Sequence, residues 1–71
     1  MSKDLKTLIA LLEKYCGEIE LISYGLAPNP NGFCYELYDP DNVSLEDLTK
    51  INLLLDTLST KDTNVLKSLY L

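Results

Sequence analysis

The sequence of 71 residues contains no histidine, arginine, tryptophan or glutamine. Without histidine it lacks the side chain most often used as a general base near neutral pH, and without arginine it lacks the planar group that grips phosphate with two hydrogen bonds. It also has no apolar run long enough to span a membrane, and no basic start followed by an apolar stretch, the pattern of a secretory signal. We therefore expect a cytoplasmic protein that does not enter a membrane.

Cysteine is scarce as well, with Cys16 and Cys34 as the only two. Small secreted domains usually carry four or more cysteines in a disulfide framework, so we expect both thiols to be reduced. A reactive thiol needs a nearby cation or a helix N-terminus, whereas Cys16 falls at the predicted C-terminal end of a helix. Neither thiol is therefore expected to be reactive.

Motifs that carry catalytic chemistry are also missing, since there is no phosphate-binding loop, no nucleophile elbow and no Cys/His metal set. Residues 39–46 offer oxygen ligands at loop spacing, but Val43 stands where a calcium loop needs a ligand and no glycine is present. A chain of this length also has little volume for a catalytic pocket. We therefore expect no enzymatic activity, no cofactor and no bound metal.

Apolar residues are plentiful: 46% of the sequence is hydrophobic and only 24% is charged, which argues against disorder. The length allows one domain, residues 1–71. Apolar residues at helical spacing predict a first helix that Ser2 caps and that ends near Cys16, with Gly17 in the position that commonly stops a helix.

Two more helices are predicted in the second half of the chain. Ser44 and Asp47 form a variant of the capping box, and the helix that they open runs to about Leu58. A short last helix, capped by Thr60 or Asp62, must dock on the core to persist. The first of these helices has a very wide apolar arc that can serve two neighbours at once, made of Leu45, Leu48, Ile51, Leu54, Leu55 and Leu58. The last helix must dock through its apolar stripe, made of Val65, Leu66, Leu69 and Tyr70.

Two strands, Glu18 to Leu26 and Phe33 to Tyr38, are predicted between these helices, because both segments are rich in apolar and aromatic residues and are bounded by turn residues. Pairing Leu26 with Phe33 gives one continuous apolar face, made of Ile22, Tyr24, Leu26, Phe33, Tyr35 and Leu37. The predicted fold is therefore a small α+β domain of order α-β-β-α-α, with a two-stranded antiparallel hairpin packed on helices.

Charge is distributed very unevenly along the chain, whose net charge is −5. Between Tyr15 and Thr49 there is no lysine, and we call this stretch the acidic segment. Turn chemistry and helix N-termini account for some of its carboxylates, and charge runs are usually solvated faces. The acidic segment also predicts a partner-binding surface, to which we assign Glu18, Glu20, Glu36, Tyr38, Asp39, Asp41, Glu46 and Asp47.

The partner predicted by this surface is a protein with a basic groove, which the acidic segment would occupy. Direct binding to nucleic acid or to an anionic membrane is not expected of a chain with so few cations. In size, charge and α+β content the chain resembles small acidic phage-encoded inhibitors of nucleic-acid enzymes, including some anti-CRISPR proteins, although the resemblance covers no motif. It implies an inhibitor or modulator carried by a phage or mobile element.

A second hypothesis is that the protein is a small structural or regulatory protein that acts by self-association. The helix predicted after Ser44 has a wider apolar arc than one neighbour requires, and Leu53 and Leu54 are the residues expected to face a second chain in a homodimer. An open strand edge offers another route to pairing. Binding that weakens steeply with salt would favour the acidic surface, whereas self-association should respond little.

Overall fold

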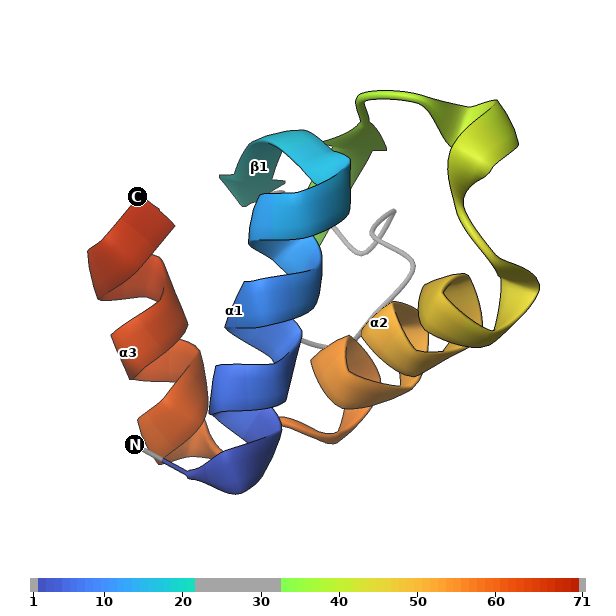
Figure 1. Ribbon diagram of the computed structural model, residues 1–71. Helices are drawn as coiled ribbons and strands as arrows, with labels where there is room; N and C mark the ends of the chain where they lie inside the picture. The colour runs from blue at the N-terminus through green and yellow to red at the C-terminus, as the bar shows by residue number, and fades with distance from the viewer. Residues whose placement is uncertain (1, 22–32, 71) are drawn as a thin grey trace.

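The computed structural model describes residues 2–21 and 33–70, with the backbone alone for 18–21 (Figure 1). Along the chain it contains α1 (Lys3–Tyr15), β1 (Cys16–Leu21), β2 (Phe33–Leu37), the 3-10 turn η1 (Pro40–Asn42), α2 (Leu45–Thr57) and α3 (Thr60–Tyr70). Strands β1 and β2 form a two-stranded antiparallel sheet. The predicted α+β layout of order α-β-β-α-α is confirmed.

Helix α1 begins as predicted, because the Ser2 hydroxyl accepts a hydrogen bond from the backbone N–H of Leu5 at 3.1 Å. Its end differs from the prediction. Cys16 adopts an extended conformation, so the chain passes directly from α1 into β1, and Gly17 is a strand residue and not the helix stop. A Cβ at this position would lie 3.1 Å from the ring of Tyr38, so a larger residue would push the ring aside by a few tenths of an ångström.

The register of the hairpin also differs from the prediction. Phe33 is paired with Leu21 and not with Leu26, and the register is irregular between Cys16 and Glu18. The cause is the direct connection from α1, since the backbone N–H of Tyr38 donates to the carbonyl of Tyr15 at 2.8 Å and so fixes β2 against the end of the helix. The predicted partners Ile22, Tyr24 and Leu26 lie outside the described residues.

The face of β2 that was predicted to be apolar does meet the core. Phe33 is fully buried, Tyr35 and Leu37 are half-buried against the core, and Glu36 is exposed. This alternation is that of a strand with one buried face.

Helix α2 is capped as predicted, with the Ser44 hydroxyl accepting from the N–H of Asp47 at 3.1 Å. The cap of α3 was predicted wrongly. Ser59 occupies that position and accepts from the N–H of Asp62 at 3.1 Å, because it immediately precedes the first helical residue. The Ser2 hydroxyl in turn donates to the Asp62 carboxylate at 2.6 Å, which joins the start of α1 to the start of α3.

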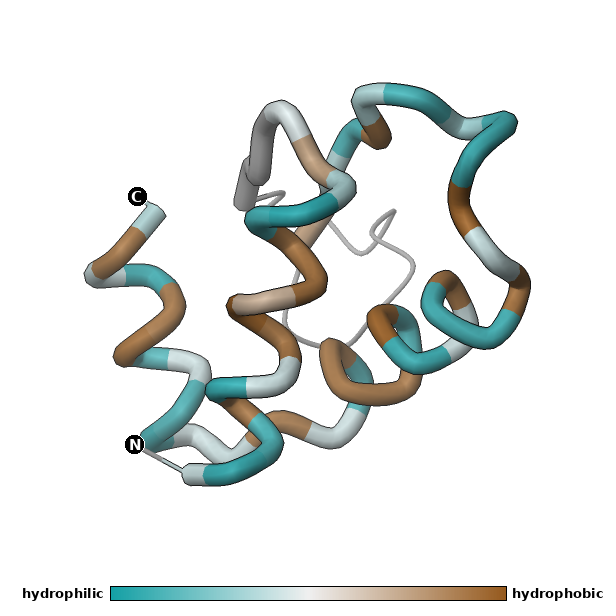
Figure 2. The backbone as a smooth tube through the Cα atoms, viewed as in Figure 1, coloured by the Kyte–Doolittle hydropathy of each residue, from teal (hydrophilic) through white to brown (hydrophobic). Residues whose placement is uncertain are grey.

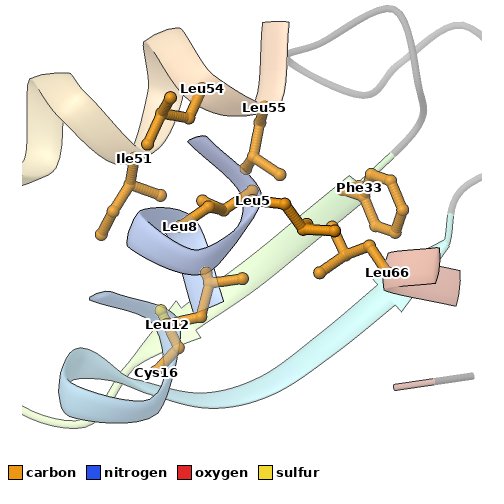
Figure 3. Packing of buried hydrophobic residues seen from close by; sticks show 9 residues of the cluster. All are labelled: Leu5, Leu8, Leu12, Cys16, Phe33, Ile51, Leu54, Leu55 and Leu66. Carbon is orange, nitrogen blue, oxygen red and sulfur yellow. The ribbon is translucent and has the colours of Figure 1, made fainter. Parts of the chain in front are cut away.

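The core is built mainly from leucines of the three helices, with Phe33 from β2 (Figure 3). Helix α1 supplies its centre, and in Figure 1 it lies between α2 and α3. Two leucines of the predicted apolar arcs are mostly exposed, namely Leu45, with 79% of its surface accessible, and Leu69. The buried apolar residues are Leu5, Leu8, Leu12, Cys16, Phe33, Ile51, Leu54, Leu55 and Leu66.

Candidate functional site

The acidic segment runs through the hairpin, η1 and the first turn of α2, and Figure 2 shows the hydrophilic stretch that leads from β2 through η1. Glu36, Asp39, Asp41 and Glu46 are exposed, and Tyr38 has 70% of its surface accessible, as predicted. The side chains of Glu18 and Glu20 lie outside the described residues, but the register places the backbone of Glu18 directly opposite Glu36. Like charges at directly opposed positions destabilise a sheet.

Asp39 has a local structural role. Its carboxylate accepts a hydrogen bond from the side-chain amide of Asn42, and its carbonyl accepts from the backbone N–H of Asn42 at 3.0 Å. Together with Pro40 these bonds shape the turn η1. Asp39 therefore contributes to the turn as well as to the negative surface.

Asp47 has a tertiary role that the sequence did not indicate. The hydroxyl of Tyr15, at the end of α1, donates to its carboxylate and so ties α1 to the start of α2. This hydrogen bond, with a further one from Ser44 and the charges of Lys14 and Lys50, lowers the pKa of Asp47. Asp47 is half-buried and already partnered, so it differs from the freely exposed carboxylates of the acidic segment.

An open groove of about 510 Å³ lies beside these carboxylates, between β2 and α2. One wall is the run Cys34–Leu37, and the other contains Leu48 and Asn52 of α2, with Pro40 also lining the groove. The Tyr35 hydroxyl donates to the side-chain oxygen of Asn52 at 2.6 Å and so links the two walls. Partial burial raises the pKa of Tyr35, which keeps the hydroxyl protonated as a donor.

Leu48 is half-buried in this groove and lies outside the hydrophobic cluster that forms the core. Leu45 precedes it by three residues, so both fall on one face of α2, and Leu45 is mostly exposed. The sequence placed both leucines in an apolar arc that could serve two neighbours. The structure instead places them beside the acidic segment.

The two residues predicted to face a second chain lie in different environments. Leu53 is 58% exposed, whereas Leu54 is only 8% exposed and packs in the core of its own chain. Adjacent helix positions differ by about 100° around the axis, so only one of the pair faces solvent. The position of Leu54 therefore does not fit the predicted interface role.

Both cysteines are free thiols. Burial raises the pKa of Cys16, which disfavours its reactive thiolate form. Within residues 2–21 and 33–70 there is no group of three or more histidine, cysteine or acidic side chains that could hold a metal ion. Over the same part of the chain, no helix has the length and apolar character needed to cross a membrane.

Comparisons of this chain with protein-family models, with curated proteins and with solved structures find no match.

Proposed function

We propose that this protein is a non-enzymatic interaction module that binds a basic surface of a larger protein through its acidic segment. The observation that carries the proposal is that Glu36, Asp41 and Glu46 are exposed within a stretch that contains no lysine. A partner that otherwise holds nucleic acid would have the matching charge. The protein would then act as an inhibitor or modulator by occupying that basic groove.

Two physical effects support this assignment. A patch of uncompensated negative charge attracts a basic surface over a distance and speeds its association. Glu36 is exposed on β2, so a cationic side chain of a partner can reach it and form a favourable charge pair. Asp39 and Asp47 contribute charge, but each also holds the fold, so they are poor positions for a test.

The test compares two variants that each remove three exposed carboxylates. The first combines Glu36→Gln, Asp41→Asn and Glu46→Gln. The matched control combines Asp4→Asn, Glu13→Gln and Asp56→Asn, which lie outside the acidic segment. Both variants have the same net charge, so any difference between them reports on position.

Immobilised parent and variant proteins would be used to capture partners from cells of the source organism, with mass spectrometry as the readout. We expect a basic protein that the parent and the control retain and that the first variant loses. With that partner purified, affinity for the parent should fall steeply with salt, because exposed charges are screened. Equal retention by all three proteins would refute the proposal.

Self-association is the second candidate, and the exposure of Leu53 on α2 is the observation that favours it. Sedimentation equilibrium of the parent and of Leu53→Gln tests it directly. A dimer that Leu53→Gln dissociates, together with no loss of partner in the three-carboxylate variant, would replace the first proposal with the second.

A further inference from the structure

The groove between β2 and α2 runs along the edge of a strand. Its β2 wall is made of four consecutive residues, Cys34–Leu37. Successive side chains of a strand point to opposite faces, so a wall to which all four contribute is the edge of the strand and not one of its faces.

This edge is open. β2 pairs with β1 on one side only, and no described residue outside β1 hydrogen-bonds to the backbone of Cys34–Leu37. An open strand edge presents backbone N–H and C=O groups to any extended chain that reaches it. Binding proteins use such edges to add a strand from a partner, with main-chain hydrogen bonds supplying affinity and alternate side chains supplying specificity.

We infer that the groove takes an extended segment of the partner protein, in which apolar residues alternate with lysine or arginine, as a third strand on the free edge of β2. This inference rests on the proposed function and names the part of the partner that the chain recognises. We expect apolar and basic residues to alternate in the added strand because one side of the β2 edge is apolar and the other side is negatively charged.

The side towards α2 is apolar. Tyr35 and Leu37 of β2 lie on the face that packs on the core, and Leu48 and Pro40 line the same groove. Leu48 is half-buried and lines the groove, so the exposed part of its side chain can contact an incoming side chain. Every second residue of the added strand would therefore be apolar.

The other side is negative. Glu36 is exposed on the opposite face of β2, with Glu18 at the paired position on β1. A lysine or arginine of the added strand would stand opposite Glu36, where oppositely charged cross-strand pairs are favourable. A second copy of this chain is the poorer occupant, because two chains of net charge −5 repel each other.

The probe is the synthetic peptide Lys-Val-Lys-Val-Lys-Val-Lys, labelled for fluorescence anisotropy at low salt. We expect it to bind the parent, and the same peptide with glutamate in place of lysine not to bind. Glu36→Gln and Leu48→Gln should each weaken binding by ~5-fold, the size of one cross-strand pair. Leu53→Gln is the matched control for Leu48→Gln, since it is the same change on an exposed face of the same helix, and should leave affinity unchanged.

Two further peptides test strand addition itself. One is N-methylated at every valine and the other at every lysine, so each lacks the N–H donors along one edge of the extended peptide. Strand addition requires that one form loses binding and the other retains it. Amide shifts in a two-dimensional NMR spectrum of the parent should then be confined to residues 33–38 and 45–52.

The outcomes separate this inference from the proposed function. If the lysine-valine peptide does not bind, if both methylated forms bind equally, or if Leu48→Gln and Leu53→Gln act alike, the third-strand inference is overturned. The proposed function would still stand if the captured partner is lost from the three-carboxylate variant. If the lysine-valine peptide does not bind and the three-carboxylate variant also retains every captured partner, both the third-strand inference and the proposed function are refuted.

Discussion

Thr63 in α3 offers a quantitative test of how the core is assembled. Its side chain is 6% exposed, and its hydroxyl oxygen is buried without a hydrogen-bond partner among the residues that the structure describes. Its backbone N–H is satisfied by the carbonyl of Ser59 at 2.8 Å, so the unpaired group is the side chain alone. Thr63→Val replaces this hydroxyl with a methyl group at nearly the same volume.

The magnitude follows from the cost of burying an unpaired polar group, which is about 1–3 kcal/mol. Threonine and valine have similar helix propensities, so the backbone contributes little to the difference. We therefore expect Thr63→Val to raise the free energy of unfolding by about 1–2 kcal/mol. For a domain of this size, the midpoint of thermal unfolding should rise by ~4–8 °C for each kcal/mol.

Thr57 in α2 provides the matched control, because it is exposed and its hydroxyl donates to the carbonyl of Leu53 at 2.9 Å. Thr57→Val should change the free energy of unfolding by no more than ~0.5 kcal/mol. Both variants would be compared with the parent by urea denaturation and by thermal unfolding, followed by circular dichroism. If Thr63→Val destabilises the protein while Thr57→Val is neutral, the hydroxyl of Thr63 has a partner in the folded state and the reasoning fails.

Three further changes test the helix contacts. Leu12→Ala removes a buried leucine of α1, and urea denaturation should show a loss of ~2–5 kcal/mol, whereas a loss below that range would place Leu12 outside the core. Ser59→Ala should cost about 0.5–2 kcal/mol in the same assay, and an equal loss from Thr60→Ala would contradict the assigned cap. Tyr15→Phe removes the hydrogen bond that is the largest cause of the low pKa of Asp47, so an NMR titration should show that pKa rising towards its ordinary value of 3.8. Because that pKa is lowered in the folded state, the stability that the parent gains over Tyr15→Phe is present above pH 3.8 and should disappear as the pH falls through the lower folded-state value.

The helices were predictable from the sequence because their signals are local. The spacing of Leu5, Leu8 and Leu12 marks the buried side of α1, and Ser2 and Ser44 cap the helices that follow them, as predicted. The uneven charge is equally a property of the sequence, since the absence of lysine between Tyr15 and Thr49 needs no fold to be seen. These features fixed the α+β layout and identified the acidic segment as the surface of interest.

The hairpin register was not predictable, because a strand can slide in steps along its neighbour and the apolar pattern alone allows more than one alignment. The register is set by a contact between distant parts of the chain. This contact is the hydrogen bond from the backbone N–H of Tyr38 to the carbonyl of Tyr15 at the end of α1. The same junction explains why Gly17 is a strand residue packed under the Tyr38 ring.

Some features of the interaction surface were predictable from the sequence, and others only from the tertiary structure. Sequence alone identified the exposed carboxylates of the acidic segment and the exposed Tyr38. Only the tertiary structure paired Asp47 with Tyr15, buried Leu54 while leaving Leu53 exposed, and set Leu48 against the edge of β2. The sequence does not show which neighbour an apolar residue will contact, so the groove forms only once the fold places α2 opposite β2.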